Sequence, residues 1–96
     1  MTGLPSRDDL AGQIESLFTL DRNIRLKLIK VTEIVSRPPQ EQFTAVFLAP
    51  PDSGLEQRIY EMEHPVLGRM DLFLVPVALN ENGLEMQAVF NYLVDR

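Results

Sequence analysis

The stretch HPVLGRMDLFLVPV, from His64 to Val77, predicts a turn followed by a long strand. In the second half of this stretch apolar side chains occupy odd and even positions alike, so both faces of the strand need a cover. We expect Leu72 and Leu74 to lie against the domain's own core. We expect Phe73 and Val75 to be covered by a helix, by the interior of a barrel or by a second chain.

The segment QRIYEMEH, which precedes this turn, is predicted to be the partner strand of an antiparallel hairpin. Pairing the two strands gathers apolar side chains on one face, namely Tyr60, Met62, Met70, Leu72 and Leu74. The other face carries Glu61, Glu63, Asp71 and Phe73. The turn NENG then leads into the last strand, and the pattern predicts a shared face for Phe73, Val75, Val77, Met86, Ala88 and Phe90.

Residues 6–17 are predicted to form one short amphipathic helix. Ser6 is suited to cap its first turn, and Leu10, Ile14 and Phe18 recur at helical spacing. We expect these three apolar side chains to dock the helix on a sheet.

Three further segments predict strands: FTLDRNIRLKLIKVTEIV (18–35), FTAVFLA (43–49) and LEMQAVFNYLV (84–94). In the first of them the apolar positions change parity after Leu28, where Ile29 follows directly. One extra residue in a strand re-aims every later side chain, so this change predicts a β-bulge near Leu28 and Ile29.

The predicted fold class is α+β. One N-terminal helix packs on an antiparallel, strongly twisted meander sheet of five to six strands, or on a small, partly open barrel. We expect residues 1–96 to form a single domain, with the helix over 6–17 and the β meander over 18–94.

Composition narrows the possible partners. The formal net charge is −5, with only 9 Lys and Arg residues, which argues against nucleic-acid binding. The basic run RLKLIK is interpreted as a strand with solvated charges rather than a phosphate-binding patch. The absence of cysteine and of a long apolar segment leads us to expect a cytoplasmic protein with no membrane association.

Chemical motifs are weak. The single histidine, His64, precedes a proline and is expected to stabilise the hairpin through a hydrogen bond, and Gly68, Asn82 and Gly83 are likewise assigned to turns. Glu61, Glu63 and Asp71 fit a solvated acidic face better than a cation site. Ser53 lies in an ordinary turn, and nothing in the sequence supplies its general base. We therefore expect no enzymatic activity, no metal and no cofactor.

The C-terminal half carries the pattern F-x-x-x-F-x-x-P, then Q-x-x-Y-x-x-x-H-x-x-x-G, then L-F-L-x-P and A-V-F-N. These motifs are formed by Phe43, Phe47, Pro50, Gln57, Tyr60, His64, Gly68, Leu72, Phe73, Leu74, Pro76, Ala88, Val89, Phe90 and Asn91. From Phe43 to Leu93 this pattern resembles that of a family of short bacterial proteins of unknown function. The family is the numbered domain of unknown function DUF6916. The resemblance implies no established activity, but it suggests a part in phage-tail-like or other surface assemblies.

Two functions from different classes remain. The first is a non-catalytic structural or protein-interaction module, an accessory part of a phage-tail-like or other multiprotein assembly that acts as a homo-oligomer or on a protein partner. The alternative is a small barrel that holds an apolar ligand between Phe47, Phe73 and Phe90. Candidate interface or ligand-facing residues are Phe47, Tyr60, Phe73, Val75, Phe90 and Tyr92. A filled core with an exposed apolar patch would favour the interaction module, and a large interior cavity would favour the ligand binder.

Overall fold

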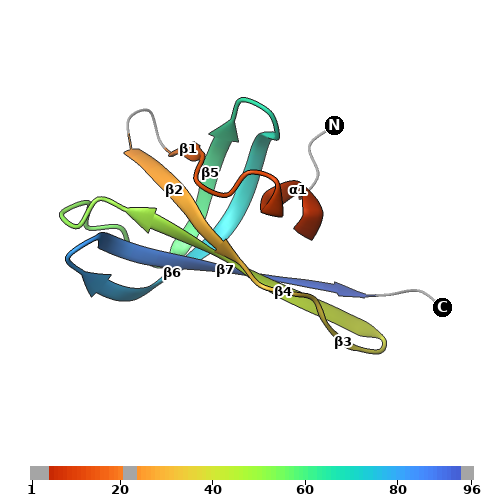
Figure 1. The fold of residues 1–96 in the computed structure, drawn as a ribbon. Helices are drawn as coiled ribbons and strands as arrows, with labels where there is room; N and C mark the ends of the chain where they lie inside the picture. Colours follow the sequence, from red (N-terminus) through yellow and green to blue (C-terminus); the bar gives the residue numbers. More distant parts are fainter. Residues whose placement is uncertain (1–4, 21–23, 94–96) are drawn as a thin grey trace.

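The computed structural model describes residues 5–20 and 24–93, which form one short helix and seven strands (Figure 1). The elements are α1 (Arg7–Ala11), β1 (Leu17–Leu20), β2 (Ile24–Val31), β3 (Val35–Arg37), β4 (Gln40–Ala49), β5 (Arg58–His64), β6 (Gly68–Asn80) and β7 (Gly83–Leu93). The strands are hydrogen-bonded in the order β2-β1-β5-β6-β7-β4-β3, and the pairing of β2 with β4 closes six of them into a barrel. The fold is therefore mostly β, and the α+β class expected from the sequence is corrected.

The helix is shorter than the sequence predicts, because it covers Arg7–Ala11 instead of residues 6–17. Its start is as expected: the Ser6 hydroxyl accepts a hydrogen bond from the Asp9 amide, and the Asp9 carboxylate accepts one from the Ser6 amide. Gly12 forms the C-cap, so the chain leaves the helix before Ile14, whose side chain is 41% exposed.

Only Leu10 of the three expected docking residues reaches the core from the helix. Phe18 is also fully buried, but it lies on β1, which begins at Leu17. A helical and a strand pattern overlap at this point, and the pairing of Phe18 with Leu26 on β2 places it in the sheet.

The sheet is not a simple meander. Neighbours around the barrel run β1-β2-β4-β7-β6-β5, and β5 returns to β1 through the pairs Thr19–Glu63 and Leu20–Met62. Strands β4 and β5 are consecutive in the chain but lie three positions apart around this ring, so residues 50–57 must pass from one side of the barrel to the other.

The bulge predicted near Leu28 and Ile29 is confirmed. Leu28 pairs with Phe47, but Lys30 pairs with Val46, so Ile29 is the extra residue of β2. Because of this extra residue, Lys30 is exposed and Val31 packs against the core that also holds Leu28.

A second bulge, in β6, overturns the face predicted for the last strand. Pro76 pairs with Met86 and Ala78 pairs with Glu85, so Val77 is inserted between them. Proline has no N–H to donate and is tolerated in strands at such irregularities. The shift reverses the parity, so that Met86, Ala88 and Phe90 lie in the core with Leu72 and Leu74 instead of on the face of Phe73.

Large apolar side chains of the described residues pack in the barrel interior. The rings of Phe43 and Phe90 stack at a centroid distance of 4.6 Å, and Phe18 meets Phe47 edge to face at 5.1 Å. Leu10 of α1 belongs to the same buried cluster.

Candidate functional site

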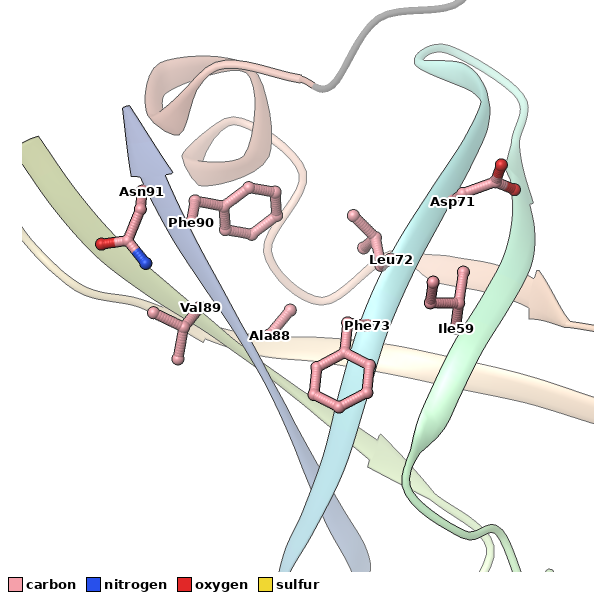
Figure 2. Close-up of a pocket in the computed structure, with 8 residues that line it drawn as sticks. All are labelled: Ile59, Asp71, Leu72, Phe73, Ala88, Val89, Phe90 and Asn91. Carbon is pink, nitrogen blue, oxygen red and sulfur yellow. The ribbon is translucent and has the colours of Figure 1, made fainter. Parts of the chain in front are cut away.

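Three exposed apolar side chains on the outer face of β5, β6 and β7 lie around one depression. Ile59 and Phe73 pair directly across β5 and β6, and Val89 lies on β7 (Figure 2). Their exposed fractions are 65%, 50% and 46%, respectively. We call Ile59, Phe73 and Val89 the apolar patch. The hairpin pairing predicted from the sequence is confirmed, because Tyr60 pairs with Leu72 and Met62 with Met70 on the buried side.

The patch surrounds an open depression between β6 and β7. The ladder between these strands extends only from Asn80–Gly83 to Val75–Gln87. Beyond it, Gly68–Leu74 continues beside β5 while Ala88–Leu93 continues beside β4 and away from β6 (Figures 1 and 2). We call the region between these two segments the β6–β7 seam.

The depression in the seam has a volume of about 450 Å³. It is lined by Ile59, Asp71, Leu72, Phe73, Ala88, Val89, Phe90 and Asn91, and Figure 2 shows side chains from both strands around it. Most of these side chains are apolar, and Asp71 is the single ionisable group among them. The depression can therefore take an apolar group, with a cation at one end.

The acidic side chains beside the depression are only partly neutralised by a basic side chain. Asp71 pairs across the hairpin with Glu61, and like charges at directly opposed positions repel each other. Arg69 donates a hydrogen bond to Glu63 at 3.0 Å and lies 4.0 Å from Glu61, and these contacts raise its pKa. Within the described ranges, the Asp71 side chain makes no hydrogen bond or ion pair, so its carboxylate faces solvent at the edge of the seam.

His64 links the β5–β6 turn to the segment after α1. Its Nδ1 accepts hydrogen bonds from the amides of Val66 and Leu67, at 3.0 and 3.2 Å. Its Nε2 lies 2.9 Å from the Ser16 hydroxyl, which donates to the Gln13 carbonyl at 2.6 Å. The ring is 5% exposed, and this burial lowers the pKa of His64 below its ordinary value.

The contact between Ser16 and His64 was not predicted from the sequence, and it has the residue types of a nucleophile and its base. Two amide donors at Nδ1 require that nitrogen to be unprotonated, so the neutral ring carries its proton on Nε2. Nε2 therefore donates to Ser16 and cannot take its proton. The geometry supports a structural hydrogen-bond chain rather than an activated serine.

The other residues predicted for an interface or ligand site are divided between the core and the surface. Phe47, Tyr60 and Phe90 are buried, with the Tyr60 hydroxyl donating to the Glu56 carbonyl at 2.6 Å. Val75 and Tyr92 are partly buried. Phe73 lies on the outer face, so neither the helix nor the barrel interior covers it, and those two predicted covers are wrong.

The predicted turn residues lie at the two hairpin ends of β6. Gly68 pairs with His64 and has a φ of 83°. Gly83 follows Asn82 and has a φ of 145°, and the Asn82 amide donates to the Asn80 side chain at 2.9 Å. An added Cβ at Gly83 would collide with the Ala49 carbonyl oxygen of β4, so this position requires glycine for space as well as for its backbone conformation.

The described part of the chain contains no group of three or more His, Cys, Asp and Glu residues that could hold a metal ion. No helix within residues 5–20 and 24–93 is long and apolar enough to cross a membrane.

The sequence model of a family described as a domain of unknown function (DUF6916) matches residues 5–90. The chain belongs to this family. The match extends the DUF6916 resemblance from the C-terminal half to α1 and the first strands, which thus belong to the same family domain. Neither the curated proteins nor the solved structures gave a significant match to this DUF6916 domain.

Proposed function

We propose that this DUF6916 domain is a non-catalytic protein-interaction module that docks through the apolar patch. One observation carries the proposal: Ile59, Phe73 and Val89 are between 46% and 65% exposed around an open depression on one face. Single exposed apolar residues are normal on a protein surface, but a cluster around a depression is typical of binding sites.

The filled core also favours docking over ligand storage inside the barrel. Phe47 and Phe90 are buried against other aromatic rings, and Phe47 does not line the depression. The alternative, an apolar small ligand, is supported by the depression's volume, which falls in the range of about 300–1,000 Å³ common for ligand pockets. Its open position on the outer face is less suited to a small molecule, which is usually largely enclosed.

The module would work as an accessory part of a multiprotein assembly, phage-tail-like or other, as the family resemblance implies. A domain that contributes a docking face and no chemistry fits such a part. It would act on a protein partner or as a homo-oligomer.

Photo-crosslinking in the native host tests the proposal. A photoreactive phenylalanine analogue replaces Phe73, and in a control chain it replaces Val66, which is 70% exposed in the β5–β6 turn and outside the depression. We expect a protein adduct of defined mass from position 73 that is lost when Ile59→Asp is added, and no such adduct from position 66. Equal labelling at both positions, or no protein adduct at position 73, would contradict a docking role for the patch.

A further inference from the structure

The β6–β7 seam leaves strand edges without a partner. In an antiparallel ladder, successive residues direct their N–H and C=O groups alternately to the two neighbouring strands. Ala88–Leu93 pairs with Gln40–Ala45 of β4 on one side, and the described residues supply no ladder on its other side. This segment offers about 20 Å of free strand edge, at about 3.3 Å per residue.

A free edge of this kind is a template for an additional strand, and proteins usually shield it with charge or a cover. Among the described residues, the edge of β7 from Ala88 to Leu93 carries no acidic or basic side chain and has no strand beside it, although the Tyr92 hydroxyl donates to the Pro5 carbonyl at 3.4 Å. Its side chains are Ala88, Val89, Phe90, Asn91, Tyr92 and Leu93, which include no ionisable group apart from the tyrosine hydroxyl.

Apolar side chains flank the seam on its outer face and on its core side, which is the arrangement that an inserted strand needs. Phe73 and Val89 flank it on the outer face, whereas Leu72 and Phe90 approach it from the core side (Figure 2). A strand alternates its side chains between two faces, so apolar residues on both sides of an inserted segment would meet apolar neighbours.

The charges indicate what kind of chain fits. Asp71 lines the depression without an ionic partner among the described residues, and Glu61 lies directly opposite it. A cationic side chain placed there would relieve the repulsion between the two carboxylates. A second copy of this chain, at a formal net charge of −5, would instead bring more acidic groups to the same rim.

We propose that the β6–β7 seam binds an extended segment of a partner protein, which adds as a strand to the free edge of Ala88–Leu93 and places a Lys or Arg side chain beside Asp71. This inference rests on the docking role proposed above and specifies its partner. Main-chain hydrogen bonds would supply much of the affinity, and the alternating apolar side chains and the cation would supply the specificity.

Blocked synthetic peptides provide the probe. In the basic probe valine alternates with threonine over seven residues and one threonine is replaced by lysine; in the acidic probe the same threonine is replaced by glutamate. Two further versions of the basic probe carry N-methyl groups on the amides of one edge or of the other. Binding to the intact chain is followed by amide chemical shifts and by hydrogen exchange.

We expect the basic probe to bind about fivefold or more tightly than the acidic one, and Asp71→Asn to remove that preference. Amides within Ala88–Leu93 should become protected from exchange on binding. One set of N-methyl groups should abolish binding and the other should be tolerated, because only one edge of the added strand faces β7. Val66→Ser serves as the matched control and should change none of these results.

Other outcomes would overturn the inference. These are no binding of the basic probe at millimolar concentration, equal binding of the two charged probes, or tolerance of both N-methylated versions. Protection of Ala88–Leu93 that rises with protein concentration in the absence of peptide would show that a second copy fills the seam. If position 73 still crosslinks to a protein in any of these cases, only strand addition fails and the docking face remains.

Discussion

Leu72 and Phe73 are neighbours on β6 but lie on opposite sides of the barrel wall, at 3% and 50% exposure. The same charge introduced at the two positions should therefore have very different effects. Leu72→Glu places an unpaired carboxylate in the core and should destabilise the protein by several kcal/mol or unfold it. Phe73→Glu should stay folded and lose no more than about 1 kcal/mol. Urea denaturation followed by circular dichroism measures both, and similar losses for the two variants would show that β6 has been placed with the wrong parity.

Leu10 and Ile14 were both expected to dock the helix on the sheet, but the short helix contains only Leu10. Leu10→Ala removes a fully buried side chain and should cost about 2–4 kcal/mol. Ile14→Ala, at a position 41% exposed and beyond the helix, should cost less than about 1 kcal/mol. Chemical denaturation of the pair tests this difference, and an equally large loss for Ile14→Ala would support the longer helix over 6–17.

His64 should make stability depend on pH. Burial lowers its pKa in the folded state below the ordinary 6.5, so the unfolded chain binds a proton first as the pH falls. The free energy of unfolding should have its highest value above about pH 7. It should decline as the pH drops below 6.5 towards the pKa of His64 in the folded state. Urea titrations at several pH values between 8 and 5.5 measure this decline.

His64→Gln provides the control for that experiment. Glutamine keeps one acceptor and one donor without a titrating group, so the variant should lose about 1–2 kcal/mol at pH 8 through poorer hydrogen bonds and should lose the pH dependence between 8 and 5.5. The same slope in the variant and in the natural protein would assign the effect to another group.

Gly83 and Gly68 differ in what an added methyl group would meet. Both have a positive φ, but an alanine Cβ has open space at Gly68 and meets the Ala49 carbonyl oxygen at Gly83. Gly68→Ala should cost about 1–2 kcal/mol for the backbone conformation alone, and Gly83→Ala should cost clearly more. Thermal unfolding of both variants tests the order, which would be reversed if the β6–β7 turn could move away from β4.

Local patterns predicted much of the sheet. Alternation in YEMEH and MDLF was sufficient to place Tyr60 and Leu72 on the same face of a hairpin, and the parity change after Leu28 identified the first bulge. The second bulge, in β6, was not predicted from the sequence. Apolar residues occupy every position around Pro76, so alternation carries no information there. The proline itself was the available signal, since it disfavours a regular ladder.

Features that depend on tertiary contacts could not be predicted from spacing. The hydrogen bond between Ser16 and His64 joins residues 48 positions apart in the chain. The pairing of β5 with β1 likewise joins segments that lie far apart in the sequence. The candidate docking face was only half anticipated: Phe73 was expected to need a cover, whereas Ile59, Val89 and the seam emerged from the register of β6 and β7.

The most direct test of a docking role for the apolar patch is the yield of a photo-adduct from the other side of the seam. A photoreactive analogue at Val89 should crosslink to a partner protein in the host, because Val89 and Phe73 line the same depression. We predict that Phe73→Glu, which stays folded, reduces this adduct to background, whereas Val66→Glu leaves its yield unchanged. An undiminished adduct at Val89 in the Phe73→Glu protein would contradict the account, because a partner would then bind without the patch.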